Sequence, residues 1–120
     1  MDTIQSKIEK HQKILTEYIN DLAEEKNDSI GVDFKHFAIV DTKNNHFQLI
    51  RMGWWGKEYI YKVLIHMSIS AEAGNIWVWK NDTEIPVDVE LAQQYGVIKK
   101  YLTVGWLPTD VQEVAGYATA

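Results

Sequence analysis

The sequence has no cysteine, only two prolines and no long hydrophobic run among its 120 residues. Without cysteine, the chain cannot form disulfide bonds, thiolate metal sites, iron–sulfur clusters or a cysteine nucleophile. No apolar stretch approaches the ~20 residues that span a bilayer, and the N-terminus lacks the basic and then apolar order of a secretion signal. We therefore expect a soluble, cytoplasmic protein without a membrane segment.

Basic residues are also scarce, and they are dispersed. The chain holds 12 Lys and Arg against 17 Asp and Glu, which gives a formal charge of −5. Both ends of the chain are acidic, and only the middle carries a slight excess of Lys and Arg. A protein that binds duplex DNA by itself usually presents a concentrated basic face, because neutralising phosphates supplies most of the affinity. Direct DNA binding is therefore disfavoured.

Large apolar side chains, by contrast, are abundant. The length suits a single domain over residues 1–120, and 46% of the residues are hydrophobic. Five Trp and six Tyr are many for a chain of this size. Rings of this size need either a core or an interface.

A regular alternation occupies residues 58–70. Its odd positions, from Tyr59 to Ile69, are apolar, and most of its even positions are polar. Because successive strand side chains point to opposite faces, this pattern predicts a long strand with its odd face in a core. Ile60 and Leu64 are the exceptions, which place apolar groups on the even face.

Turn signals around this strand predict an antiparallel meander. Strands are expected over 32–40, 46–52, 58–70 and 76–80. A change in pleat parity predicts a bulge near His36. With turns centred near residues 55 and 73, Phe47 lies opposite Val63 and Met67 lies opposite Trp79, so that all four face the core.

Helices are expected at both ends of the chain. A capping box at Asp2 and Gln5 opens a helix through about Lys26, whose apolar stripe covers the odd face of the sheet. The stripe consists of Ile4, Ile8, Leu15, Tyr18, Ile19 and Leu22. Residues 87–95 predict a short helix with Val89 facing inward, and Pro108 opens a last helical turn. The predicted fold is α+β: an N-terminal helix packed on a four-stranded antiparallel β-meander, with short C-terminal helices.

Several apolar residues in this arrangement are candidates for contact with another protein. Trp54 and Trp55 are adjacent, so in extended backbone they cannot both point inward. An apolar patch on the even face of a soluble domain usually marks an interface. We therefore expect contacts to a second subunit, a partner or the C-terminal segment at Trp54, Trp55, Ile50, Met52, Ile60 and Leu64, with Val78 on the same face.

A polar cluster offers an alternative from a different functional class. The inferred register places Asp41, His46 and His66 together on the even face. A carboxylate that orients a His can form a general base, and two His with an Asp can hold a metal. Three residues without the spacing of a local motif are weak evidence for a catalytic or metal site. The sequence contains no hydrolase elbow, phosphate-binding Gly loop or His-Glu-x-x-His motif. We expect a protein without catalytic residues, cofactor or metal. The alternative is a small-molecule-binding or hydrolytic domain that uses this cluster.

The order of several short motifs resembles the XisI family, the fdxN-element excision controlling factors of cyanobacteria. The matching residues run from Phe47 to Ala118: Phe47-Gln48-Leu49, Gly53-Trp54, Tyr61 to His66, Asn75-Ile76-Trp77-Val78, Asp82-Thr83-Glu84, Glu90-Leu91, Gly96-Val97, Pro108 and Gly116-Tyr117-Ala118. The chain departs from the family pattern at Leu107-Pro108-Thr109, where His-Pro-Pro is expected. It departs again at Gln112-Glu113-Val114, where a basic pair before an aromatic is expected.

The resemblance implies an α+β protein that performs no strand cleavage itself. It implies action with an XisH-type protein in the programmed excision of a DNA element by a site-specific recombinase, which in cyanobacteria belongs to heterocyst differentiation. Since XisH-type proteins look nuclease-like, we expect an acidic companion to restrain or position a basic partner. We also expect a homo-oligomer or a partner-bound protein.

Overall fold

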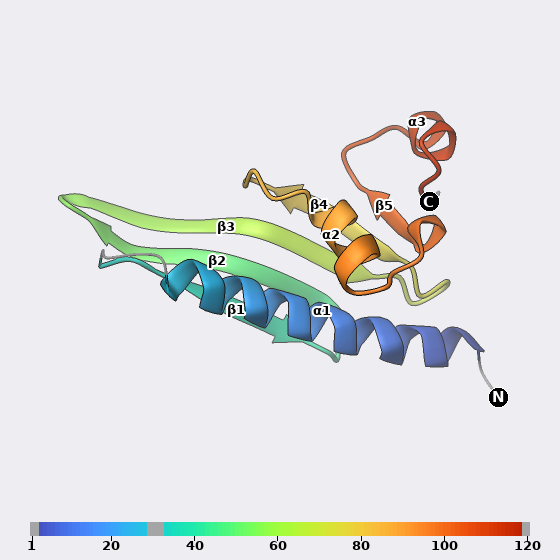
Figure 1. Cartoon of the computed structure of the whole chain (residues 1–120), viewed down its shortest axis with the longest axis horizontal. Coiled ribbons are helices and arrows are strands. Elements are labelled where there is room, and N and C mark those ends of the chain that lie inside the picture. Colours follow the sequence, from blue (N-terminus) through green and yellow to red (C-terminus); the bar gives the residue numbers. More distant parts are fainter. Residues whose placement is uncertain (1–2, 29–32, 119–120) are drawn as a thin grey trace.

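The computed structural model describes residues 3–28 and 33–118 of the chain, which form one sheet with helices packed against it (Figure 1). In chain order the elements are α1 (Thr3–Asp28), β1 (Lys35–Asp41), β2 (His46–Trp55), β3 (Glu58–Ile69), β4 (Ile76–Asn81), α2 (Val87–Gln94), the 3-10 helix η1 (Lys99–Tyr101), β5 (Leu102–Val104) and α3 (Thr109–Val114). The strand order follows the sequence order, β1 to β5. No helix in the described residues combines the length and apolar character that a membrane crossing requires.

The predicted α+β class is correct, and the strand count is not. Four strands pair antiparallel as expected. A fifth strand, β5, pairs parallel with β4. A parallel pair needs a crossover connection, and here α2 and η1 provide it between β4 and β5.

Helix α1 covers the sheet with the predicted apolar stripe. Its buried stripe residues are Ile8, Leu15, Tyr18, Ile19 and Leu22. Ile4 is 41% exposed because the first turn of α1 extends past the core. Asp2, the predicted cap, lies outside the described residues.

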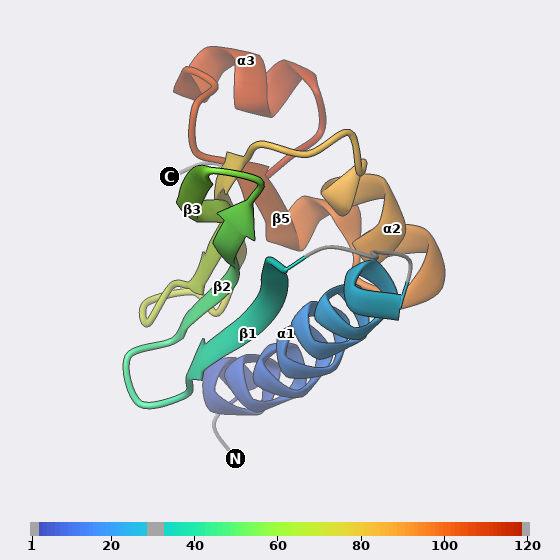
Figure 2. The same ribbon diagram turned by 90° about the vertical axis from the view of Figure 1, so that its left-hand side faces the viewer.

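Helix α2 lies on the same face of the sheet as α1 and is tied to it. The Tyr18 hydroxyl donates to Glu90 at 2.7 Å, and the Tyr95 hydroxyl donates to Asp21 at 2.7 Å. Val89 is exposed, contrary to the prediction, because Val87 and Leu91 face the core and Val89 lies on the opposite side of the helix. Figure 2 shows α1 and α2 on one side of the sheet, with α3 beside β5.

The β2–β3 hairpin departs from the inferred register. Its turn falls at Gly56 and Lys57 instead of residue 55, so Trp54 pairs with Tyr59. The register then shifts where Leu64 is inserted as an extra residue: Ile50 pairs with Val63, whereas Leu49 pairs with Ile65. Such a bulge changes which face the following side chains occupy.

The bulge divides β3 into two halves with opposite core faces. After Leu64, the odd residues Ile65, Met67 and Ile69 are buried, as predicted. Before Leu64, the odd residues Tyr59 and Tyr61 are on the other face and exposed. The prediction of one continuous odd core face is therefore correct only for the second half of the strand.

Strand β1 has no bulge at His36, since its pairing with β2 is continuous from Lys35 to Asp41. His36 is itself buried, and Phe37 and Ile39 are exposed. The buried position of His36 is explained by its partners. Arg51 Nε donates to His36 Nε2 at 3.0 Å, and the side chain of Asn27 pairs with both the backbone N–H and the carbonyl of His36.

Candidate interaction surface

One face of the sheet, opposite α1 and α2, is apolar over β1, β2 and the first half of β3. Directly paired residues in neighbouring strands share a face, and here Trp54 pairs with Tyr59, Met52 with Tyr61 and Ile50 with Val63. From β1, Phe37 pairs with Ile50 and thus lies on the same face. We call this surface the outer-face patch: Phe37, Ile39, Ile50, Met52, Trp54, Tyr59, Tyr61 and Val63.

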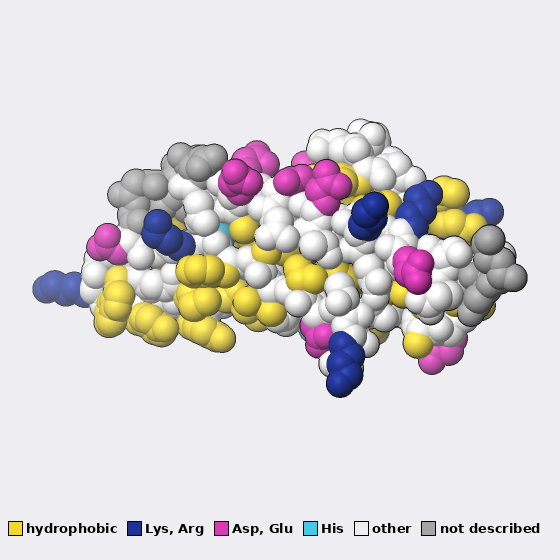
Figure 3. Space-filling view, turned by 90° about the horizontal axis from the view of Figure 1, so that it is seen from below, with side chains coloured by type: hydrophobic (Ala, Val, Ile, Leu, Met, Phe, Trp, Pro, Cys, Tyr) yellow, Lys and Arg dark blue, Asp and Glu magenta, His cyan; other side chains and the backbone are white. Residues whose placement is uncertain are grey.

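Much of the outer-face patch is accessible to solvent. Trp54, Tyr59 and Tyr61 are 52%, 58% and 65% exposed, and Phe37 and Ile39 are exposed as well. Figure 3 shows hydrophobic side chains gathered at the end of the molecule that holds the β2–β3 hairpin, with no acidic side chain among them. Contiguous apolar surface of this kind is uncommon on a monomer unless it is functional.

The patch has a rigid centre. Ile50 is 7% exposed and lies between its strand partners Phe37 and Val63. The rings of Trp54 and Tyr59 meet edge to face with centroids 5.2 Å apart. Packed aromatic rings on strands lose little conformational freedom when a partner binds, and Trp and Tyr are enriched at interface hot spots.

The structure places the predicted contact residues on two different faces. Ile50, Met52 and Trp54 belong to the outer-face patch. Leu64 and Val78 are buried in the core on the helix side. Ile60 pairs with Gly53 and is half-buried on the helix side, and Trp55, although 62% exposed, also points to that side.

Sequence reasoning missed Phe37, Ile39, Tyr59, Tyr61 and Val63 as members of the patch. For β3, the position of the hairpin turn determines which residues belong to the patch. A two-residue turn at Gly56-Lys57 pairs Trp54 with Tyr59 and brings the two tyrosines of β3 beside Met52 and Trp54. The inferred turn centre at residue 55 reversed this relation, because it shifted the register by three residues, and an odd shift exchanges the two faces of a strand.

The aromatic character of this face continues onto β4. The rings of Trp77 and Trp79 stack at 4.7 Å, and the Trp79 indole N–H donates to Ser68 Oγ at 2.7 Å. Trp79 is 46% exposed, so the predicted core position is wrong. The reason is a second register shift, which makes Val78 and not Trp79 the strand partner of Met67.

The polar cluster predicted from the register lies at the end of the same face. His46 Nδ1 and His66 Nε2 are 3.0 Å apart, so the N–H of one ring donates a hydrogen bond to the other ring. Asp41 pairs with His46 across the strands, but its carboxylate accepts hydrogen bonds from the backbone N–H groups of Lys43 and Asn44 and from the Asn44 side chain. The carboxylate of Asp41 thus stabilises the β1–β2 turn.

The electrostatics of this cluster favour a structural role. The hydrogen bonds from Asn44 lower the pKa of Asp41, so the carboxylate stays charged in the turn. Burial and the neighbouring His46 lower the pKa of His66. Within residues 3–28 and 33–118, no group of three His, Cys, Asp or Glu side chains could hold a metal ion.

The C-terminal departure from the family pattern also has a structural explanation. Gln112 of α3 is buried, and its side-chain amide donates to the carbonyls of Val104 and Leu107. Where a basic pair is expected, this chain uses an amide that fixes α3 against the end of β5.

The fold and the surface define an α+β protein whose sheet is covered by helices on one face and is apolar and exposed on the other. The chain belongs to the XisI family, since the family model described as XisI protein matches residues 1–119. Among curated proteins, no sequence matches this chain. The resemblance drawn from the short motifs is therefore confirmed.

Solved structures support the same assignment. A XisI-like protein from Anabaena variabilis ATCC 29413 is 27% identical, has a TM-score of 0.81, and the match covers 94% of this chain and 99% of that one. The fdxN element excision controlling factor XisI from the same organism is 18% identical with a TM-score of 0.73, over 95% of this chain and 99% of its own. The second likeness shows the fold alone.

Proposed function

We propose that this chain is a non-enzymatic regulatory factor that acts with an XisH-type partner protein to control site-specific excision of a DNA element. Membership in the XisI family and the likeness to the Anabaena excision controlling factor support the biological setting. The observation that carries the proposal is the outer-face patch, which we assign as the docking surface for the partner.

The chemistry of the patch suits a protein better than DNA. Its centre is apolar and aromatic, and the cation Lys35 of β1, the strand partner of Met52, lies beside it on the same face. Protein interfaces typically have an apolar centre with a polar rim. DNA binding needs several cations that face the phosphates together. The net charge of −5 adds long-range attraction toward a basic partner and speeds the encounter more than it strengthens the complex.

A matched pair of Trp substitutions tests this docking surface. Trp54 and Trp106 are 52% and 56% exposed, but only Trp54 lies in the outer-face patch. We expect Trp54→Ala to weaken binding of the purified XisH-type partner by about 30-fold, which corresponds to an interface hot spot of about 2 kcal/mol. Trp106→Ala should bind like wild type. Isothermal titration calorimetry provides the affinities.

Two results would contradict the proposal. If the partner and the wild-type chain elute separately at micromolar concentration after co-expression, the partner assignment fails. If Trp54→Ala and Trp106→Ala bind equally well, the partner docks elsewhere. A reporter that counts excision events then tests the biological role, since Trp54→Ala should change excision frequency in the same direction as deletion of the gene.

A further inference from the structure

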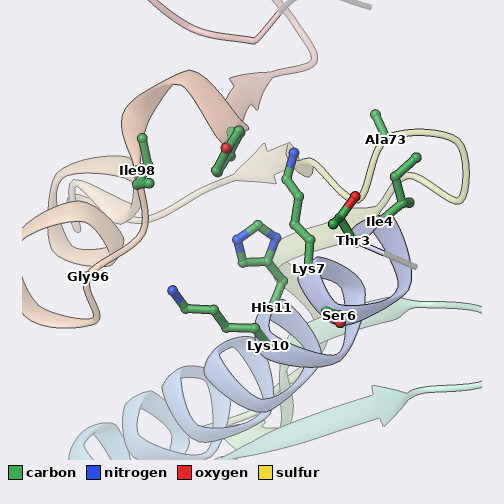
Figure 4. Close-up of a pocket in the computed structure, with 10 residues that line it drawn as sticks. Thr3, Ile4, Ser6, Lys7, Lys10, His11, Ala73, Gly96 and Ile98 are labelled. Atoms are coloured by element: carbon green, nitrogen blue, oxygen red, sulfur yellow. The ribbon is translucent and has the colours of Figure 1, made fainter. Parts of the chain in front are cut away.

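A second candidate site lies far from the hairpin tip, between the first turns of α1 and the segment before β5. A cavity of about 510 Å³ is lined there by Thr3, Ile4, Ser6, Lys7, Lys10, His11, Ala73, Gly96, Ile98 and Tyr101. Its size falls in the range of small-molecule sites. Figure 4 shows Lys7, Lys10 and His11 projecting from one side of α1 toward the segment that carries Gly96 and Ile98.

The cavity gathers positive charge on an acidic protein. None of its lining residues is Asp or Glu, although the chain as a whole carries a charge of −5. Lys7, Lys10 and His11 share one helix face because they are three and four residues apart. Burial lowers the pKa of Lys7, and the nearby charge of Lys100, from η1, lowers it further.

Lys7 is held in place by neutral partners. Lys7 Nζ donates to Asn75 Oδ1 at 2.6 Å and lies 3.5 Å from the centroid of the Tyr101 ring. Neither partner carries a negative charge. In the described part of the chain, neither Lys7 nor Lys10 forms an ion pair with a carboxylate. Among the described residues, no carboxylate therefore offsets the charges of Lys7 and Lys10 by direct contact.

His11 completes the floor of the cavity. It is 3% exposed, and its Nδ1–H donates to the carbonyl of Gly74 at 2.7 Å. A carbonyl can only accept, so Nδ1 carries the proton of the neutral ring and Nε2 keeps its lone pair. Burial and the nearby Lys7 and Lys10 lower the pKa of His11, while the bond to Gly74 raises it.

We propose that this cavity binds a small phosphate-bearing molecule with an apolar or ring-shaped remainder, such as a nucleoside monophosphate. Lys7 and Lys10 would meet the phosphate oxygens, and the hydroxyls of Thr3 and Ser6 offer further neutral donors. The remainder of the ligand would lie against Ile98 and the ring of Tyr101, which form the apolar wall. This site does not depend on the proposed partner function.

Titration of the full-length chain with AMP tests the proposal. We expect saturable binding by calorimetry, with amide NMR shifts confined to the cavity, including His11, Gly74 and Tyr101. Lys10→Gln should weaken AMP binding by about tenfold. This variant should fold normally, because Lys10 is exposed and makes no hydrogen bond or ion pair in the described part of the chain.

Lys13→Gln is the matched control, since it removes the same charge from the same helix at an exposed position outside the cavity. It should bind AMP within about twofold of wild type. Adenosine, which lacks the phosphate, should bind much more weakly than AMP, and inorganic phosphate should compete with AMP. The proposal fails if AMP shows no saturable binding, if adenosine binds as tightly as AMP, or if Lys10→Gln and Lys13→Gln lose affinity equally.

Discussion

At the scale of single residues, His36 connects three elements with one buried imidazole. Asn27 at the end of α1 pairs with the backbone of His36, and Arg51 of β2 donates to its ring. The Asn27 amide thereby satisfies backbone groups at the free edge of β1, which would otherwise attract another strand. Burial and the charges of Arg51 and Lys26 lower the pKa of His36 to about 4.

This arrangement makes the stability of the fold depend on pH. His36 is neutral in the folded chain, but in the unfolded chain it gains a proton near its ordinary pKa of about 6.5. The unfolded state therefore binds more protons as the pH falls, and the folded state loses stability between about 6.5 and about 4. Between pH 6.5 and 5, His36 alone should account for a loss of about 2 kcal/mol.

Urea unfolding at pH 7 and pH 5 measures this effect. His36→Gln keeps an acceptor for Arg51 and a donor for Asn27 but cannot titrate, so the difference between the two pH values should shrink. A residual pH dependence is expected, because burial also lowers the pKa of His11 and His66. Equal pH dependence in wild type and His36→Gln would show that His36 is not the titrating group.

At the scale of secondary structure, the extra residue Leu64 decides which side chains of β3 reach the surface. Leu64 is 2% exposed and packs in the core, whereas Tyr61, three residues earlier, is 65% exposed on the outer face. The same substitution should therefore destabilise the fold strongly at Leu64 and change its stability little at Tyr61.

We expect Leu64→Lys to destabilise the fold by more than about 3 kcal/mol, because it buries a charge and removes a packed side chain. Tyr61→Lys should change stability by less than about 1 kcal/mol, since the position is open to water. Chemical denaturation of both variants compares them directly. If Tyr61→Lys destabilised as much as Leu64→Lys, Tyr61 would lie in the core and the bulge would be misplaced.

The same strand shows what sequence could and could not predict. The alternation from Tyr59 to Ile69 is regular, so it predicted the strand with nearly correct ends. A bulge leaves no mark in such a pattern, because Leu64 and Ile65 are both apolar and either could face the core. The location of the hairpin turn had to be known before Tyr59 and Tyr61 could be assigned to a face.

Local patterns predicted helices well and long-range pairing poorly. The spacing from Ile8 to Leu22 fixed the buried side of α1, because helix periodicity depends on neighbours in sequence. The fifth strand is only three residues long, Leu102–Val104, and pairs through a crossover. No periodicity exists in a segment that short. In the cavity, Lys7 and Lys10 come from α1, whereas Gly96, Ile98 and Tyr101 are far from α1 in the sequence, so local patterns did not bring these residues together.

At the scale of the whole molecule, the chain is elongated, with extents of 50 × 31 × 24 Å. The hairpin with the outer-face patch occupies one end, and the N-terminal part of α1 with the basic cavity lies toward the other (Figure 1). The two proposed sites therefore do not overlap. Substitutions in the cavity should leave partner affinity unchanged, and substitutions in the patch should leave AMP affinity unchanged.

An exposed apolar patch also affects how copies of the chain meet each other. In the absence of a partner, two copies can cover the patch by placing the same surface against itself, as in isologous dimers. We expect the wild-type chain to show a molar mass that rises toward a dimer with concentration in light scattering after gel filtration. Tyr61→Lys should shift this equilibrium to the monomer, because pairing would bring two buried lysines together.

The partner should compete with this self-association. If the XisH-type protein docks on the outer-face patch, the patch cannot hold a second copy at the same time, so adding partner should replace the homodimer by a complex with one copy of this chain. Trp106→Lys, outside the patch, should follow wild type in both respects. Two results would contradict this: a wild-type chain that stays a dimer within the partner complex, or a Tyr61→Lys variant that dimerises like wild type. Either result would place the contact between copies on another surface, and the patch would then bind only the partner.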